Sequence, residues 1–319
     1  MKTIKRLSRE TNVISLPDQT DSHTGIISRK IAPMTVEMEK DFLYDQYTLP
    51  DSFPYESTVR KFQWDKIRRH LVFLDSIQQG NVRWGILQNY RNMNGKAPVV
   101  KVNHKNEYNS ISDAFGVDQN QSVPLFFPDN RTVAERYGKD GSLVKYIADT
   151  AGFTKIDVIS IEGEWLVPKK YIRPINDTVI FKKAIFVDRT NQNITVLEKV
   201  GAIWLIRSMN PATTGRRKPP FERATPTGIF VIQGKKGQMF FYKDGTTEIG
   251  GFAPYASRFS NGGYIHGVPV NLPHTEIIEY IPTLGTTPRS HMCVRNATSH
   301  ARFIFDWAPV EETLVFVFD

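Results

Sequence analysis

The sequence has little cysteine, no long apolar run and no extreme excess of one charge. A single cysteine among 319 residues excludes an internal disulfide and a cysteine-based zinc cage, so Cys293 must serve in packing or through its reactivity. No run of about 18 apolar residues occurs, so no integral membrane segment is expected. The hydrophobic content of 40% and the charged content of 23% are typical of a folded globular chain.

The net charge of +8 would favour an anionic polymer or surface as partner. The basic residues are scattered, however, and runs such as Arg68-Arg69 are too short to follow a phosphate backbone, so no nucleic-acid partner is expected. The basic amino terminus, MKTIKRLSRE, is not followed by an apolar stretch. If the protein is exported, we expect that its signal or anchor is absent from this sequence.

The first quarter of the chain divides into two segments. Residues 1–40 are polar, contain two prolines, and are predicted to be a tether or a strap along another domain. Residues 41–81 are predicted to be a helical segment, because five apolar residues between positions 57 and 79 recur at helical spacing before Gly80. We interpret this stripe as a packing face, with a partner-binding face as the alternative. The five residues are Trp64, Ile67, Leu71, Leu74 and Ile77.

Residues 82–175 are predicted to form a small β-barrel-like domain. Short apolar runs broken by Asn, Gly and Pro indicate several short strands. The stretch VISIEGEWLVPKKYI resembles the closing strands of a bacterial Src-homology-3-like barrel. We interpret the aromatic residues of this region as core, with a peptide-binding groove as the alternative. These residues are Trp84, Tyr146, Trp165 and Tyr171.

Strands continue through residues 176–319. The runs VIFKKAIFVD and NITVLEKV are joined by a polar turn of hairpin length at residues 189–192. The run ARFIFDWA has a helical pattern, and TLVFVF alternates like a strand that needs a sheet to receive it. The expected fold class is therefore mainly β (α+β).

The stretch SHMCVRN, residues 290–296, carries the clearest chemistry. A cysteine is nucleophilic only as thiolate, and a histidine could form with it a thiolate–imidazolium pair that then acts as base and acid. His291 lies two residues before Cys293, so in an extended segment both side chains would point to the same face. His266 lies further upstream in the glycine-rich stretch GGYIHG, where the backbone can approach closely. From the residues alone, both histidines remain candidates.

The pairing of IHG with a downstream SHxCVRN resembles the signature of the YkuD-type L,D-transpeptidases, whose usual form is His-Gly followed by Ser-His-Gly-Cys and Arg. The resemblance implies that His266 is the base, that Cys293 is the nucleophile and that the Gly267 carbonyl orients the base, with His291 as a further member of the site. Upstream, ATPTGIF resembles the TPxGxF strand entry of the family, and PYASRF resembles its proline-tyrosine segment near the donor site. A YkuD-type β-sandwich-like catalytic domain is thus expected in residues 176–319.

Two features depart from the family pattern. Met292 stands where the family usually has glycine, and if this position needs a positive φ, the side chain adds about 1 kcal/mol or more of strain. The connection between Gly267 and Ser290 carries His274, Thr275 and Glu276, and it could act as a lid over the donor groove.

The resemblance implies a two-step acyl transfer on a tetrapeptide stem of peptidoglycan. Cys293 would attack the carbonyl of the third stem residue, D-alanine would leave, and an acceptor amine would attack the thioester. Backbone amides around His291, Met292 and Cys293 would hold the oxyanion. The expected substrate contacts are Tyr255, Arg258, Ser290, Arg295 and Asn296.

The expected partners are peptidoglycan stem peptides and carbapenem-type inhibitors, and neither a metal nor an organic cofactor is required. We expect an exported protein of the periplasm or cell envelope. Three alternatives remain: an L,D-carboxypeptidase of the same fold, a catalytically silent cell-wall-binding protein favoured by Met292, and a papain-like protease. The protease is disfavoured because the histidine precedes the cysteine here. Arg295 could also be a structural hydrogen-bond donor rather than a substrate contact.

Overall fold

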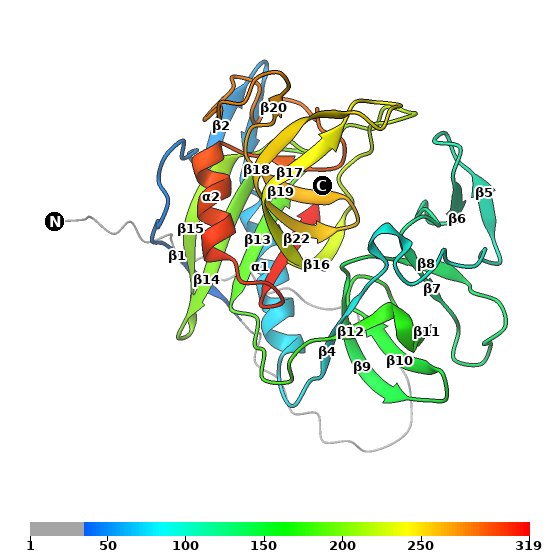
Figure 1. Cartoon of the computed structure of the whole chain (residues 1–319). Coiled ribbons are helices and arrows are strands. Elements are labelled where there is room, and N and C mark those ends of the chain that lie inside the picture. Colours follow the sequence, from blue (N-terminus) through cyan, green and yellow to red (C-terminus); the bar gives the residue numbers. More distant parts are fainter. Residues whose placement is uncertain (1–34) are drawn as a thin grey trace.

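The protein is mostly β in the computed structural model, which describes residues 35–319 (Figure 1). This confirms the fold class expected from the sequence. Of the tether predicted for residues 1–40, residues 1–34 lie outside the described part of the chain. The remainder includes strand β1 (Glu37–Lys40), which pairs in parallel with strand β15 (Ile203–Pro211). No helix in residues 35–319 has the length and apolar character needed to cross a membrane.

A six-stranded sheet forms the centre of the C-terminal part of the fold. In sheet order its strands are β1, β15, β14 (Asn193–Val200), β13 (Lys183–Asp188), β22 (Thr313–Phe318) and β16 (Gly228–Val231). Strands β13 and β14 form the hairpin predicted from the polar turn at residues 189–192. Strand β22 is the alternating run at the end of the chain, and it pairs in parallel with β13.

A second sheet and a helix pack on one face of this central sheet. The second sheet has the order β17 (Gly234–Tyr242), β18 (Ile249–Ser260), β19 (Gly263–His266) and β21 (Val294–Arg295), and β20 (Val270–Asn271) pairs with β18. Helix α2 (Thr298–Trp307) follows β21 and packs beside β18, and it contains the helical pattern seen in the sequence.

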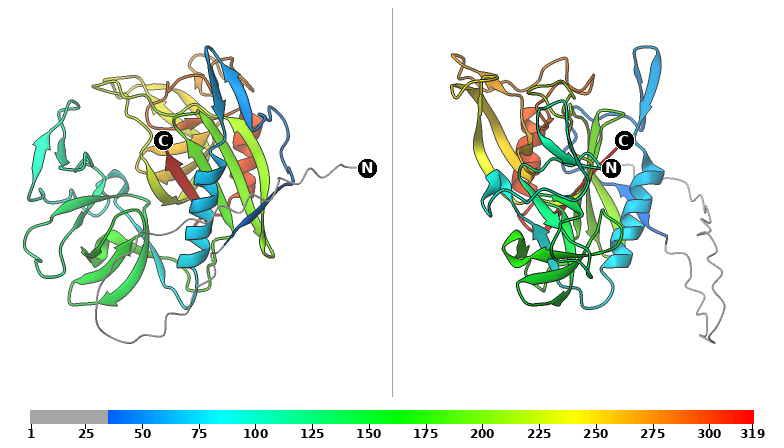
Figure 2. Two further views of the ribbon diagram at one scale, coloured as in Figure 1. Left: turned by 180° about the vertical axis from the view of Figure 1, so that it is seen from behind. Right: turned by 90° about the vertical axis from the view of Figure 1, so that its right-hand side faces the viewer.

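Both faces of the central sheet are covered by other elements. Successive side chains of a strand project to opposite faces, so each strand contributes to the packing on both sides. In β13, Ile185 and Val187 pack against the second sheet and α2, whereas Ala184 and Phe186 pack toward helix α1 (Trp64–Ile77). Figure 2 shows α1 on one side of the sheet and the strands β17 and β18 on the other. The strands β13 and β22 at the centre of the sheet are therefore mostly apolar on both faces.

Residues 82–175 contain a five-stranded sheet with a core of its own, which includes Leu87, Val144, Ile156 and Val167. The sheet order is β11 (Glu164–Pro168), β10 (Phe153–Val158), β9 (Leu143–Asp149), β4 (Trp84–Leu87) and β12 (Ile172–Pro174). The remaining elements are the strand pairs β2 (Ser52–Tyr55) with β3 (Thr58–Lys61), β5 (Asn103–Lys105) with β6 (Ile111–Asp113) and β7 (Ser122–Leu125) with β8 (Arg136–Lys139), and the short 3₁₀ helices η1 (Tyr90–Asn92) and η2 (Lys169–Tyr171). We propose that this region and residues 176–319 are separate domains.

The helix predicted between positions 57 and 79 is α1, and Gly80 after it has a φ of +85°, as a left-handed helix stop requires. Trp84, Trp165 and Tyr171 are buried, which confirms their interpretation as core residues. Tyr146 differs, because its ring is only half-buried beneath the guanidinium of a neighbouring arginine.

The five-stranded region contacts the second sheet closely at Gly141. A Cβ at this position would lie 1.9 Å from the carbonyl oxygen of Phe259, so only glycine fits. Beside it, the fully buried carboxylate of Asp140 accepts a hydrogen bond from Nη1 of Arg258 at 2.9 Å and from the backbone N–H of Asn261 at 2.9 Å. A buried ion pair therefore joins the two regions.

Candidate active site

The strand register brings His266 and Cys293 to the same face of the second sheet. Strands β19 and β21 are parallel, and Ile265 pairs with Val294 while His266 pairs with Arg295. Ile265 and Val294 are fully buried in the core beneath the sheet. Because side chains alternate along a strand, His266 and Arg295 project from the opposite face, and so does Cys293, which precedes Val294. The thiol packs there against Tyr264, the residue next to Ile265.

The thiol of Cys293 is buried, with 7% of the residue exposed. Its Sγ donates a hydrogen bond to the carbonyl oxygen of Gly262 at 3.5 Å. Burial raises the pKa of the thiol to about 11, and a backbone hydrogen bond from Tyr264 and the charge of Arg295 offset only part of this effect. In this conformation the sulfur is therefore a protonated thiol at neutral pH.

The imidazole of His266 is held in one tautomer. Its Nδ1 lies 2.6 Å from the carbonyl oxygen of Gly267 and must donate a proton, because a carbonyl oxygen can only accept. The Nε2 atom is then free to accept a proton. Burial lowers the pKa of His266 to about 4, against the opposing effect of the Gly267 hydrogen bond. Burial therefore disfavours the charged form of both groups, the imidazolium of His266 and the thiolate of Cys293.

Gly267 is fixed by close contacts on both sides. Its N–H donates to the carbonyl oxygen of Pro254 at 2.9 Å. A Cβ at Gly267 would lie 2.7 Å from Oγ1 of Thr298, which is too close for any other residue without rearrangement. The carbonyl that orients His266 is therefore set by the packing of β18 and α2.

The loop before Cys293 has a positive φ of +82° at Met292, the position where the related family usually has glycine. Two hydroxyls stabilise this loop. Oγ1 of Thr225 donates to the Met292 carbonyl oxygen at 2.8 Å, and the buried Ser290 hydroxyl donates to the Cys293 carbonyl oxygen. Thr225 belongs to the ATPTGIF motif, but no feature of that motif indicates that it supports the cysteine loop.

The two candidate histidines are separated by this turn. His291 is exposed, and its Nε2 lies 3.0 Å from Oδ1 of Asp244. The segment between His291 and Cys293 is not extended, because Met292 has a positive φ, so the condition under which both side chains would share a face is not met. Of the two histidines, His266 lies on the thiol's side of the sheet.

The five expected substrate contacts lie in different surroundings. Arg258 is 8% exposed and is bound to Asp140, so its guanidinium joins two regions of the fold. The Tyr255 ring lies against Phe305 of α2, with 6.0 Å between the ring centroids. These contacts place neither residue beside the thiol.

The other three expected contacts lie within the cysteine segment. Asn296 is fully buried; its N–H donates to the His266 carbonyl oxygen at 2.9 Å, and its Oδ1 lies 3.1 Å from Nδ1 of His300. Ser290 is engaged in the loop. Arg295 is half-buried on the thiol's face, and its Nε has no hydrogen-bond partner among residues 35–319.

A tyrosine pair that the sequence did not indicate lies at the edge of the site. The hydroxyls of Tyr264 and Tyr90 are 3.2 Å apart, and Tyr90 comes from η1 in the five-stranded region. Burial, followed by the Tyr90 hydrogen bond, raises the pKa of Tyr264. Within residues 35–319, no cluster of three or more His, Cys, Asp or Glu side chains is arranged to hold a metal ion.

Three solved structures illustrate the similarity to known proteins. An L,D-transpeptidase from Mycobacterium smegmatis is 18% identical, with 54% of this chain and 80% of that chain covered and a TM-score of 0.35. L,D-transpeptidase 3 from Mycobacterium tuberculosis, in complex with a faropenem-derived adduct, is 15% identical, with 62% and 79% covered and a TM-score of 0.34. A fused Zn-dependent amidase/peptidase/peptidoglycan-binding domain-containing protein from Clostridium acetobutylicum is 22% identical, with 44% and 53% covered and a TM-score of 0.33.

This chain thus spans about half of the Clostridium protein. No curated protein matches the chain. The family comparison is specific for one part of the sequence, which contains β13 to β22 and every residue of the cysteine and histidine motifs. Residues 182–317 match the YkuD L,D-transpeptidase catalytic domain, as the resemblance in the sequence predicts.

Proposed function

We propose that this protein is a peptidoglycan L,D-transpeptidase that forms an acyl-enzyme on Cys293 with His266 as its base. The observation that supports this most directly is the register of β19 and β21, because it sets the thiol and an imidazole with a free Nε2 on one face. The match of residues 182–317 to the L,D-transpeptidase catalytic domain supports the same reaction class.

The first half-reaction transfers one proton and one acyl group. The Cys293 proton passes to Nε2 of His266 while the sulfur attacks the carbonyl carbon of the third stem residue. The C–N bond to the terminal D-alanine then breaks, and the leaving amine takes the proton from His266. A neutral resting pair suits this sequence, since the proton moves only when the carbonyl is in place.

The second half-reaction regenerates the thiol. An acceptor amine attacks the thioester carbonyl and gives its proton to His266, and the C–S bond breaks. The sulfur then recovers the proton. When water replaces the amine, the product is a shortened stem and the enzyme acts as an L,D-carboxypeptidase.

The oxyanion would be held by backbone N–H groups of the cysteine loop. Neither the Met292 nor the Cys293 N–H donates a hydrogen bond to any residue between 35 and 319, so both are available to a substrate oxygen. The Met292 carbonyl, which shares a peptide plane with the Cys293 N–H, accepts a hydrogen bond from Thr225 at 2.8 Å, and this bond holds that plane in position. Such a donor commonly contributes about 3 to 4 kcal/mol to the transition state.

Arg295 is the expected substrate contact that we retain, because its unpaired Nε lies on the thiol's face and suits a stem carboxylate. Ser290 and Asn296 would support the loop instead. The connection between Gly267 and Ser290 would act as a lid. Residues 271–280 are all exposed, and the Ile278 carbonyl accepts a hydrogen bond from Thr298 of α2.

Because the proposed substrate is peptidoglycan, we expect the protein in the cell envelope.

The test is incubation of the purified protein with isolated sacculi, followed by mass spectrometry of the released muropeptides. We expect new cross-links through the third stem residue and release of D-alanine. His266→Ala and Cys293→Ala should abolish both products, whereas His291→Ala should retain them. Loss of activity only in His291→Ala would overturn the assignment of the base.

The same experiment separates the alternatives. Shortened stems without cross-links would identify a carboxypeptidase. A silent cell-wall-binding protein is favoured by one observation, the side chain of Met292 at a left-handed position of the cysteine loop. Exposure to a carbapenem addresses it: a stable mass adduct on Cys293, absent from Cys293→Ala, supports the enzyme. A correctly folded protein that binds sacculi but forms neither adduct nor product would overturn our proposal.

A further inference from the structure

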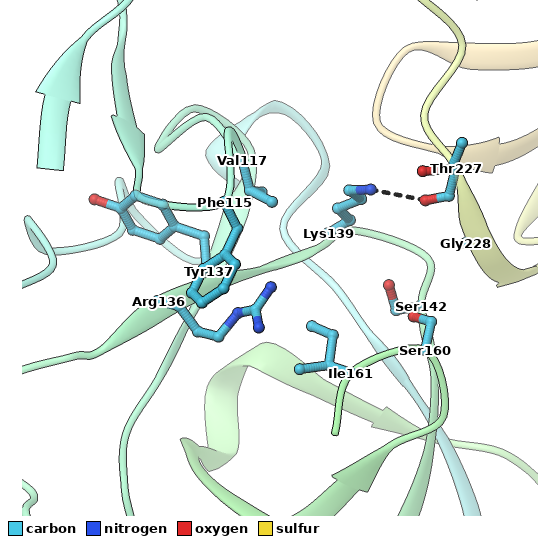
Figure 3. A pocket seen from close by; sticks show the side chains of 10 residues that line it. All are labelled: Phe115, Val117, Arg136, Tyr137, Lys139, Ser142, Ser160, Ile161, Thr227 and Gly228. Atoms are coloured by element: carbon cyan, nitrogen blue, oxygen red, sulfur yellow. Dashed lines mark hydrogen bonds between the residues drawn. The ribbon is translucent and has the colours of Figure 1, made fainter. Parts of the chain in front are cut away.

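A second site lies at the junction of the two regions, away from the thiol. A cavity of about 170 Å³ opens between the five-stranded region and the strand entry at residues 227–228 (Figure 3). At about 30 Å³ per water molecule, it has room for roughly five or six non-hydrogen atoms. Neither His266 nor Cys293 lines it. Any ligand in this cavity would therefore be separate from the acyl-transfer chemistry.

Lys139 reaches this cavity from β8. Its Nζ donates to the carbonyl oxygen of Thr227 at 2.7 Å, and it forms no ion pair with any residue between 35 and 319. Burial, followed by the charges of Arg189 and Arg136, lowers its pKa to about 8. A partly buried ammonium whose partner is a neutral carbonyl loses part of its hydration, and an anion bound beside it would offset that loss.

Arg136 supplies a second cation to the same cavity. Its guanidinium projects into the space in Figure 3, and its buried Nε has no hydrogen-bond partner among the described residues. The guanidinium carbon lies 3.8 Å from the centroid of the Phe115 ring, which orients the group without using its N–H donors. Burial lowers the pKa of Arg136. Its donors therefore remain available to a ligand.

The nearby carboxylate of Asp113 already accepts hydrogen bonds from the backbone. Its two oxygens accept hydrogen bonds from the backbone N–H groups of Phe115, Val117 and Tyr137, each at 2.9 Å. Arg189, the other cation near Lys139, is paired with the carboxylate of Asp319. Counting Lys139 and Arg136 as positive and Asp113 as negative leaves one positive charge for the cavity.

The other residues that line the cavity indicate which kind of ligand would carry the anionic group. The cavity is lined by the apolar side chains of Phe115, Val117 and Ile161 and by the hydroxyls of Ser142 and Ser160. One excess positive charge matches one carboxylate better than a phosphate of higher charge. The apolar wall suits a small organic group rather than an inorganic ion, whose whole surface is polar.

We propose that this cavity binds the terminal carboxylate of a short peptide that ends in a small residue, with Lys139 and Arg136 as its cationic contacts. The carboxylate would lie between the ammonium and the guanidinium, with the small residue against the apolar wall. The peptide chain would leave through the open side. This site would give the protein a carboxylate-specific contact at the junction, independent of Cys293.

The test is isothermal titration calorimetry with N-acetylglycine in a low-salt buffer free of phosphate and carboxylates. The Cys293→Ala protein is used so that no acyl transfer occurs, and N-acetylglycinamide is the uncharged probe of the same shape. We expect N-acetylglycine to bind and the amide not to bind. Lys139→Met and Arg136→Met should each weaken binding about tenfold or more, because each removes a charged hydrogen-bond donor. Lys101→Met, an exposed lysine of the same region, should bind like the parent.

Each other outcome overturns the proposal. Equal binding of acid and amide, or an affinity for the acid unchanged in Lys139→Met, would show that the cavity is not a carboxylate site. Tighter binding of inorganic phosphate would replace the proposed ligand class. Thermal unfolding of the variants without ligand checks the charge argument: Lys139→Met should be at least as stable as the parent, because it removes a partly buried cation that lacks an anionic partner. A large loss of stability would assign Lys139 a structural role instead.

Discussion

Met292 offers a direct test of strain beside the candidate nucleophile. With a φ of +82°, this residue is in the left-handed region, which costs a residue with a Cβ about 1 to 2 kcal/mol relative to glycine. Replacement by glycine relieves this strain but increases the conformational entropy of the unfolded chain, which costs about 0.4 to 1 kcal/mol. We therefore compare Met292→Gly with Met292→Ala, since both lose the contacts of the half-buried methionine side chain.

The expected result is that Met292→Gly is more stable than Met292→Ala by about 0.5 to 1 kcal/mol. The assay is urea unfolding followed by tryptophan fluorescence, with the free energy of unfolding obtained by linear extrapolation. The sign is informative, because at a position with negative φ the alanine variant is normally the more stable of the two.

Arg289, which is exposed in the same loop and lacks a positive φ, is the matched control. Here Arg289→Ala should be more stable than Arg289→Gly. If Met292→Ala equals or exceeds Met292→Gly in stability while Arg289 shows the ordinary order, the backbone at Met292 is not strained and our reasoning about this loop fails.

Three further predictions concern buried ionisable groups. Burial lowers the pKa of His266 to about 4 and that of His300 to about 3, so both bind protons more weakly in the folded than in the unfolded protein. The free energy of unfolding should therefore be highest above pH 6.5 and fall by about 4 kcal/mol in total by pH 5. In urea unfolding, His300→Gln should lose about half of this pH dependence, and an unchanged dependence would contradict the prediction. Asp140→Asn should lower the free energy of unfolding by about 3 to 5 kcal/mol, because Arg258 stays buried without its anion. The double variant Asp140→Asn with Arg258→Met should lose less than the sum of the two single variants, and additive losses would argue against the ion pair. Alkylation of Cys293 by iodoacetamide should accelerate from pH 7 to pH 10 without approaching a plateau, and a rate that levels off between pH 9 and pH 10 would show an unshifted pKa.

Much of the local structure followed from the sequence alone. The apolar spacing within residues 57–79 predicted α1, the polar turn at residues 189–192 predicted the hairpin of β13 and β14, and the alternating end of the chain predicted β22. These features depend on periodicity and turn composition, which are written in neighbouring residues. The motifs around His266 and Cys293 similarly predicted the catalytic domain that the family comparison confirms.

Only the tertiary structure decided which groups meet and which charges they carry. His291 is close to Cys293 in sequence, yet the parallel pairing of β19 and β21 places the distant His266 on the thiol's face. Arg258, which was expected as a substrate contact, forms a buried ion pair with Asp140 from another region. The pKa values of the thiol and the imidazole depend on burial, which is set by packing from distant segments. A sequence fixes which residues can react, but solvent exclusion and strand register, which set their partners and protonation, are properties of the folded chain.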